Sequence, residues 1–313
     1  MRKIFLSTLT VLLVSSFASA QDLGSTLGKV DAPYAKAYVA PAVNAFGMDM
    51  NSGLFHTADV GGTLPFGLSL YVGVQVGGTL VSGSDKTINL IYHDTVGVPA
   101  TYDVTNAPTI FGSKKKGMAY VTPDNQLIPA DSVPTIGGLV NTSIAPLPIP
   151  QIGLGSLFGT DVMVRYLPSI KLANFGKVQL FGWGLRHSIS QYIPLIPVDI
   201  AVQFGFQNLS IKDTSGSNVF KLSTFAANVE VSKTFAILTV YGGLQVESSK
   251  VDVSYIFTRS GLPQPIPISF SLDGQNKFRA LLGLDLGLGL LNINADYSLG
   301  AVNAVTAGLG ITI

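Results

Sequence analysis

Several segments of the chain alternate between apolar residues and small or polar residues with a period of two. From Phe66 to Val76, apolar side chains occupy the even positions, and glycine, serine, tyrosine and glutamine stand between them. The same alternation runs from Val198 to Phe206 and from Leu282 to Leu288. Because successive strand residues point to opposite faces, these segments predict β-strands with one apolar face and one small or polar face.

The C-terminal part contains the clearest hairpin. Apolar residues hold the even positions up to Leu288 and the odd positions from Leu291 onward, a change that a two-residue turn at Gly289-Leu290 explains. Glycine at the first turn position suits a type II′ turn. We therefore predict that Leu288 lies opposite Leu291 on one face, and that Asp285 lies opposite Asn294 on the other, where a hydrogen bond can join them.

The composition indicates that the apolar face meets lipid. Charged residues make up 12% of the chain, about half the usual share of about 25%. The polar face is mostly glycine, serine, threonine, asparagine and glutamine, which suits a lumen better than a surface in bulk water. Counting segments predicts an all-β, antiparallel transmembrane β-barrel of about 12 strands, within a range of 10–14. The alternative is a secreted soluble β protein.

The N-terminus has the pattern of an export signal. Arg2 and Lys3 precede an apolar stretch from Ile4 to Val14, and Ala18-Ser19-Ala20 matches a small-residue cleavage site. We expect residues 1–20 to be a cleaved signal peptide and the protein to reside in the outer membrane of a Gram-negative cell. The absence of cysteine excludes disulfides and thiol chemistry.

The rest of the chain divides into three parts. Residues 21–50 have a weak helical spacing, interrupted by Pro41, and we expect them to sit in the lumen as a plug. Residues 51–313 form the barrel. Within it, residues 81–157 are irregular and predict a largely extracellular insertion with one or two spanning strands. The uncharged stretch from Ser132 to Thr160 is no membrane helix, because its prolines break the helical ladder.

Little in the sequence indicates catalysis. His56, His93 and His187 are far apart and form no metal-binding pair, so we expect no enzyme, no cofactor and no metal site. The net charge of +1 gives no reason to expect a nucleic-acid partner. The run Lys114–Lys116 is read as a solvated loop, with binding of lipopolysaccharide phosphates as the alternative. The expected partners are outer-membrane lipid, the barrel-assembly machinery and a small-molecule solute.

Polar residues within the predicted strands are the candidates for lining the lumen, because charges at membrane depth face the interior and pair there. They are Asp161, Arg165, Asp199, Gln203, Asn228, Glu230, Gln245, Asp285, Asn292, Asn294 and Asp296. The candidates for an aromatic belt at the membrane interfaces are Tyr166, Trp183, Phe206, Tyr255 and Phe257.

A set of short motifs carries a family resemblance. It includes Asn51–Leu54, Leu64–Gly67, Pro146–Gln151, Arg165–Pro168 and Gly182–His187. Together they resemble an uncharacterised family of bacterial (Bacteroidota-like) outer-membrane β-barrel proteins. The resemblance implies no assigned activity, but it implies a barrel of the same broad type as the long-chain fatty-acid transporters.

The chain departs from those transporters in two ways. It lacks their Asn-Pro-Ala plug motif, which puts hydrophobic uptake in doubt. It ends in Ile313, where many outer-membrane barrels end in phenylalanine, which puts recognition by the assembly machinery in doubt.

Two functions remain open for a membrane barrel. One is a channel or transporter for a small or hydrophobic solute. The other is a structural or surface-interaction barrel with a filled lumen, since side chains can fill a small barrel. Solute flux through reconstituted protein separates these two, and fractionation separates both from a secreted soluble protein.

Overall fold

The computed structural model describes residues 22–62, 64, 67–172, 176–259 and 264–313. The predicted signal peptide, Phe66 in the first predicted strand and the tip of the hairpin at Ser260 to Pro263 lie outside these residues. Among the described residues, no helix combines the length and the apolar composition needed to cross a bilayer.

Two α-helices precede the strands, namely α2 (Leu23–Leu27) and α3 (Ala32–Met50), and two 3₁₀ turns, η2 (Ser84–Lys86) and η3 (Ser190–Tyr192), interrupt them. The strands are β1 (Ser69–Leu80), β2 (Thr87–Asp94), β3 (Ala100–Pro108), β4 (Met118–Pro123), β5 (Asp131–Pro134), β6 (Ile144–Leu157), β7 (Thr160–Leu172), β8 (Gly176–Ser188), β9 (Asp199–Lys212), β10 (Asn218–Phe235), β11 (Leu238–Phe257), β12 (Ile266–Asp273), β13 (Phe278–Leu288), β14 (Leu291–Leu299) and β15 (Ala304–Thr312).

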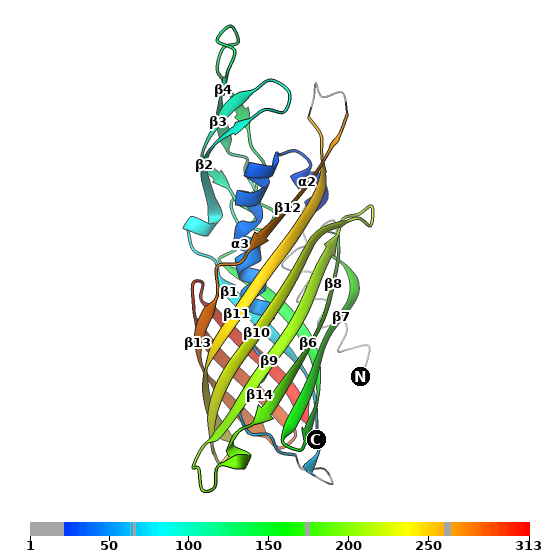
Figure 1. Cartoon of the computed structure of the whole chain (residues 1–313), viewed down its shortest axis with the longest axis vertical. Helices are drawn as coiled ribbons and strands as arrows, with labels where there is room; N and C mark the ends of the chain where they lie inside the picture. The colour runs from blue at the N-terminus through cyan, green and yellow to red at the C-terminus, as the bar shows by residue number, and fades with distance from the viewer. Residues whose placement is uncertain (1–21, 63, 65–66, 173–175, 260–263) are drawn as a thin grey trace.

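The main sheet closes on itself. It holds eleven antiparallel strands in the order β10-β9-β8-β7-β6-β1-β15-β14-β13-β11-β12, and β10 also pairs with β11. Since β12 pairs only with the upper part of β11, the closed barrel has ten strands among the described residues. A barrel is confirmed, and its ten strands lie at the lower limit of the predicted range of 10–14. The best estimate of about twelve was higher, because β2 to β5 form a separate four-stranded sheet above the barrel (Figure 1).

The C-terminal hairpin has the predicted register. Leu288 pairs with Leu291, and Asp285 pairs with Asn294. Gly289 has φ of +69°, as the first position of a type II′ turn requires. The turn between β10 and β11 lies at residues 236–237. The short turns and the C-terminus lie at one end of the barrel, called the lower end here, and the separate sheet lies at the upper end (Figure 1).

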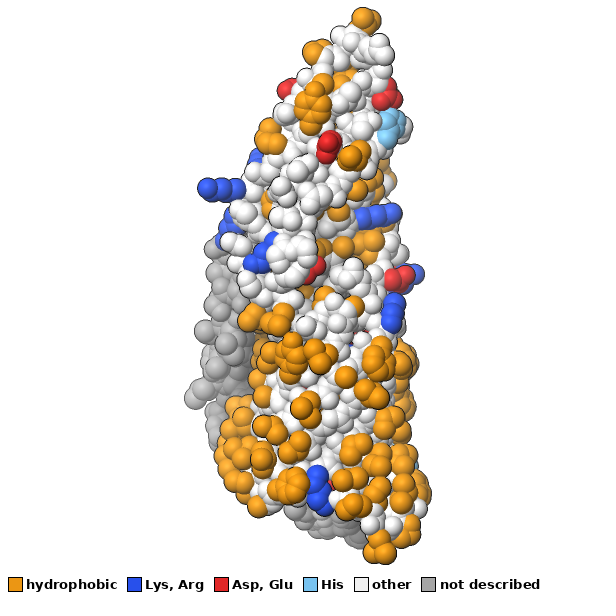
Figure 2. Space-filling view, turned by 90° about the vertical axis from the view of Figure 1, so that its left-hand side faces the viewer, with side chains coloured by type: hydrophobic (Ala, Val, Ile, Leu, Met, Phe, Trp, Pro, Cys, Tyr) orange, Lys and Arg blue, Asp and Glu red, His pale blue; other side chains and the backbone are white. Residues whose placement is uncertain are grey.

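The outer surface of the lower barrel is apolar. Leu284, Ile293 and Leu309 are 51%, 42% and 50% exposed, although they belong to paired strands. Figure 2 shows hydrophobic side chains crowding the lower part of one face, while charged side chains gather above them. An exposed apolar band around a closed barrel is the pattern of strands that face lipid.

The hairpin register can be tested by crosslinking, because the chain contains no native cysteine. We expect the variant with Asp285→Cys and Asn294→Cys to crosslink with a short bifunctional thiol reagent, since residues 285 and 294 are directly paired. The control variant, with Asp285→Cys and Ile293→Cys, should not, because neighbouring strand residues point to opposite faces. Crosslinking of the control alone would mean that the register is shifted by one residue, so that the turn is misplaced and the faces assigned to the two strands are inconsistent.

Candidate functional site

Helix α3 runs down from the upper end into the barrel (Figure 1). It begins where the side chain of Asp31 accepts a hydrogen bond of 3.2 Å from the backbone N–H of Tyr34, and a proline occupies its first turn, as is common at helix starts. Its buried residues lie on all sides, from Tyr34 to Met50. A helix that is buried all round belongs in an interior, so α3 is a plug rather than a surface helix.

The upper lumen around α3 is apolar. The buried side chains that surround the helix come from strands on several sides of the barrel, including Leu147 of β6, Leu180 of β8 and Leu222 of β10. Phe46 of the helix packs edge-on against Phe220, with ring centroids 6.5 Å apart. This packing closes the upper part of the barrel.

The upper end of α3 is also held by charged groups. Tyr92 of the separate sheet donates a hydrogen bond of 2.8 Å to Asp31, and Arg259 lies 3.8 Å from Asp31 and 3.0 Å from Asp94. Burial raises the pKa of Asp31 above its usual value, because desolvation outweighs the hydrogen bond from Tyr92. The separate sheet and the end of β11 are therefore tied to the start of the plug.

Arg165 holds the lower end of the plug. This side chain is fully buried and donates to the backbone oxygens of Met50 at 2.8 Å and Ser52 at 2.9 Å, and also to that of Gly53. Its Nε donates to Gln151 at 2.9 Å. The last carbonyls of a helix lack partners within the helix and carry partial negative charge, so a cation placed there stabilises it.

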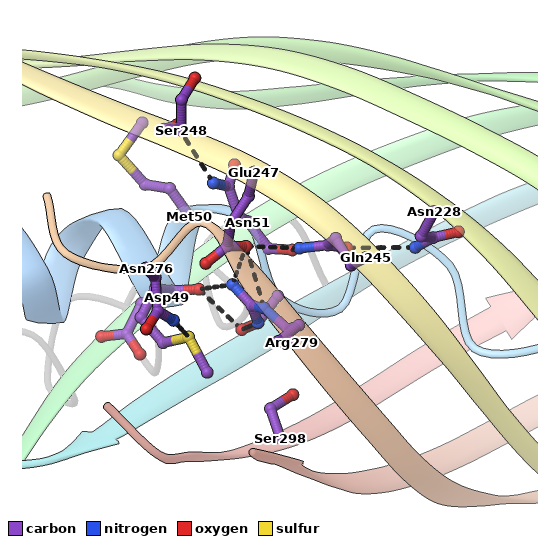
Figure 3. Close-up of polar contacts among 12 residues, drawn as sticks. Asp49, Met50, Asn51, Asn228, Gln245, Glu247, Ser248, Asn276, Arg279 and Ser298 are labelled. Carbon is purple, nitrogen blue, oxygen red and sulfur yellow. Dashed lines mark hydrogen bonds and ion pairs between the residues drawn. The ribbon is translucent and has the colours of Figure 1, made fainter. Parts of the chain in front are cut away.

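A second buried arginine completes this contact. Arg279 of β13 pairs with Glu247 of β11, with Nε 2.9 Å from the carboxylate, and donates to the backbone oxygen of Met48 at 2.9 Å. Gln245 continues the network by donating to Glu247 at 2.6 Å and to the backbone oxygen of Asn51 at 3.2 Å. Figure 3 shows these groups converging on the end of the helix. Both arginines thus bind the plug from opposite parts of the wall.

Below the helix, residues 51–62 continue through the lower lumen without regular structure. Arg186 of β8 pairs with Asp161 and donates to the backbone oxygen of Thr57. The guanidinium of Arg186 lies 4.7 Å from the ring centroid of Phe55. The hydroxyl oxygens of Thr57 and Ser232 are 3.2 Å apart, and the backbone N–H of Ala58 donates to Ser232 at 3.0 Å, so β8 and β10 both hold this part of the segment.

A cavity of about 290 Å³ lies between this segment and the wall at the lower end. His56 faces Asp285 at 3.5 Å, and the rings of His56 and Tyr71 are 5.3 Å apart. The polar lining includes Asp161, Arg186, Asp285 and Asn292, and the apolar lining includes Leu54, Phe55 and Met163. A mixed lining of this kind can bind a small molecule that has both polar and apolar parts.

The predicted lumen residues all lie on strands of the barrel wall, and most are buried. Asp199 and Asn292 are half-buried. Gln203 donates to Glu230 at 2.9 Å, and Asn228 donates to Gln245 at 3.1 Å. Arg165, Gln203, Asn228, Glu230, Gln245, Asn294 and Asp296 are buried on the inner face of the wall, and Asp161, Asp285 and Asn292 line the lower cavity. Asp199 belongs to neither group.

The expected hydrogen bond between Asp285 and Asn294 is replaced. Asn294 instead exchanges hydrogen bonds with Gln75 of β1, at 3.0 and 3.2 Å. Both residues are in register with Gly308 of β15, which lies between them. A Cβ at Gly308 would stand 2.1–2.3 Å from the two amides, so glycine is what allows them to meet. Asp285 accepts a long hydrogen bond of 3.5 Å from Asn292.

Several residues of this site are absent from the predicted set. Arg279 and Glu247 could have been predicted, because each continues the inward parity of a predicted residue on its strand, Asp285 and Gln245 respectively. In contrast, Tyr255 and Phe257 were wrongly placed in the aromatic belt. They are buried inside, and Tyr255 donates a hydrogen bond of 2.9 Å to the backbone oxygen of Val30. Val30 belongs to the segment that precedes the strands, so the alternation along β11 does not reveal this contact.

His93, His187 and the run Lys114–Lys116 lie outside the buried part of the site. His93 lies 2.9 Å from Asp124 in the separate sheet, and His187 contacts Thr160 and Tyr192 at 2.8 and 3.0 Å. The side chains of Lys114–Lys116 are exposed.

Comparison with known proteins gives a family and a general likeness. A model described as a family of unknown function, DUF6588, matches residues 1–313. No curated protein matches the sequence. Among solved structures, a loop-deletion form of OmpT from Vibrio cholerae is 9% identical, covering 79% of this chain and 99% of that one, with a TM-score of 0.26.

Two barrels of Pseudomonas aeruginosa are similarly distant. The N-terminal domain of OprF is 11% identical over 49% of this chain and 94% of that one, with a TM-score of 0.22. OccK8 is 9% identical over 79% and 97%, with a TM-score of 0.23. At these scores the likeness carries no argument about how this chain works.

Proposed function

The chain belongs to the family of unknown function DUF6588, and from its plugged lumen we propose that it is an outer-membrane barrel that passes a small solute when the whole plug, helix α3 with residues 51–62, shifts within the lumen. The observation that carries the proposal is the cavity of about 290 Å³ between residues 54–61 and the wall. The plug segment itself forms one side of this cavity, so its movement enlarges the path.

The apolar band around the lower barrel supports residence in a membrane. Leu284 and Leu309 are half exposed, and exposing such side chains to water over a whole barrel is unfavourable. Short turns face the periplasm in outer-membrane barrels, which supports an orientation with the separate sheet outside the cell and the cavity near the periplasmic end.

The chemistry of the lower lumen supports a path rather than a permanent filling. One buried side-chain oxygen in each of Gln203, Asn228, Glu230 and Asp285 accepts no hydrogen bond from the described residues. Unsatisfied buried polar groups are costly, so these acceptors suit water or a solute with hydroxyl or amide donors. In the upper lumen, by contrast, apolar side chains pack continuously around α3.

A disulfide lock tests this proposal. With Thr57→Cys and Ser232→Cys, whose hydroxyl oxygens lie 3.2 Å apart, oxidation should fasten the plug segment to β10 and abolish flux of small sugars and amino acids into proteoliposomes. Reduction should restore the flux. The matched control, with Ser254→Cys and Ser269→Cys, joins exposed residues of β11 and β12 whose hydroxyl oxygens lie 2.9 Å apart, and should leave flux unchanged in both states.

The filled-barrel alternative has one observation in its favour, the closed upper lumen. It predicts that the wild-type protein passes none of the solutes, with or without reductant. That result, from correctly folded and heat-modifiable protein, would refute the transport proposal. It would direct attention to the separate sheet of β2 to β5 as a surface for partners.

A further inference from the structure

One seam of the barrel wall is unpaired over its upper half. Strand β6 pairs with β1 from Ile144 to Gly155, but its pairing with β7 begins only at Gln151, opposite Arg165. Strand β7 nevertheless continues upward and stays paired with β8 as far as Leu172. Among the described residues, positions 144–150 of β6 therefore have no registered partner on β7.

Prolines explain why this seam stays open. The backbone N–H of Val81 donates to the oxygen of Ser143, so odd positions of β6 direct their backbone groups toward β1 and even positions direct theirs toward β7. The even positions from 146 to 150 are all proline, which has no N–H, and the N–H of Ile144 donates to the side chain of Thr142. The proline carbonyls remain as acceptors, and from 144 to 150 the edge of β6 offers β7 no donor.

The seam lies beside the apolar band. Pro146 and Pro150 are in register, through β1, with Val305 and Leu309 of β15, whose side chains are 45% and 50% exposed on the outer face. Backbone acceptors at this depth need a donor, because hydrocarbon supplies none. Behind them the wall is apolar, since Leu147, Ile149 and Leu167 are buried.

A row of lysines lies beside the upper end of the seam. Lys171 of β7, Lys177 of β8 and Lys212 of β9 are in register with one another. Like charges directly opposite each other destabilise a sheet, so a row of three favours an anion with more than one negative charge. Lower on the same strands, the exposed rings of Tyr166 and Phe181, which are also in register, mark the apolar band.

We propose that this seam and lysine row form a docking site for a lipid of the outer leaflet that carries more than one phosphate. The phosphates bind the three lysines, one acyl chain lies along the outer side of β6 beside the half-buried Pro146 and Pro150, and hydroxyl or amide groups near the lipid backbone donate to the β6 carbonyls that no described residue of β7 pairs. The site is on the outer wall, so it goes beyond the proposed transport and stands or falls independently of it.

Lipid retention by purified protein in detergent tests this site, with diphosphoryl lipid A as the probe and native mass spectrometry as the readout. Replacing Lys171 and Lys177 by glutamine should weaken retention by roughly 30-fold. The control replaces Lys221 and Lys250, exposed lysines of β10 and β11, and should retain the probe as the wild type does. Monophosphoryl lipid A should bind more weakly to the wild type only.

The seam is tested separately by restoring donors to β6. The variant with Pro148→Val and Pro150→Val gains two N–H groups that face β7. These should hydrogen-bond to β7, which should raise the unfolding temperature and reduce retention of the probe. Equal retention by both lysine pairs would overturn the headgroup site. Unchanged retention in a stabilised proline variant would overturn the seam as the acyl-chain site. Heat-modifiable migration confirms that each variant is folded.

Discussion

Replacing Arg279 by methionine is expected to cost about 3–5 kcal/mol of unfolding free energy. The change leaves the carboxylate of Glu247 buried in the lumen without its cationic partner, and it removes a donor from the backbone oxygen of Met48. Methionine keeps much of the arginine stem's volume, so loss of packing contributes little. Urea unfolding in lipid vesicles, followed by fluorescence of Trp183, the single tryptophan, measures the cost.

Two further variants separate charge from packing. Combining Arg279→Met with Glu247→Gln should recover a large part of the loss, because no charge is then left unpaired. Lys250→Met, at an exposed position on the same strand as Glu247, should change stability little. If the double variant is as unstable as the single one, the ion pair is not what stabilises the contact between plug and wall.

Replacing Leu284 by arginine should cost about 2–4 kcal/mol, the usual penalty for a cation at the lipid face near the midplane. Leu284 is half exposed on the apolar band, and its side chain has no water to reach except at the ends of the barrel. The cost can be measured by the same unfolding assay in vesicles.

The matched control is Gly287→Arg on the same strand. Gly287 lines the lower cavity, and a Cβ there would meet its nearest atom only at 3.9 Å. Gly283 is unsuitable as a control, because a Cβ there would stand 2.3 Å from the ring of Tyr241. Equal penalties at positions 284 and 287 would contradict the assignment of lipid and lumen faces.

The wall of this barrel was largely predictable from sequence, because strand parity is a local property. The register of Asp285 with Asn294 follows from one glycine turn and the change of apolar parity around it. Strand β6 was harder to predict, since prolines are depleted from the interior of sheets. It tolerates Pro146, Pro148 and Pro150 only because the backbone at these positions faces the unpaired seam. The sequence of the strand itself does not show which of its edges is unpaired.

The site was less predictable, because its contacts join distant segments. The parity of Arg165 predicted that it faces the lumen, but its partners are backbone oxygens of residues 50–53, more than a hundred positions away. Every residue has a backbone oxygen, so the sequence does not show which of these oxygens accepts a hydrogen bond. Likewise, the bond between Asn294 and Gln75 depends on Gly308, which the alternating pattern treats as an ordinary small residue.

The position of the plug constrains the order in which this protein can be assembled. Residues 22–62 leave the ribosome first, yet their anchors Arg165 and Arg279 are made much later, and the closing pair of the barrel joins β1 to β15. A helix of 19 residues that is bonded at both ends is more easily surrounded by the strands as they assemble than inserted into a barrel that has already closed. The N-terminal segment must therefore wait, unprotected, until the last strands close around it, and a chaperone that shields Tyr38, Val39 and Phe46 during that wait would increase the yield of folded protein.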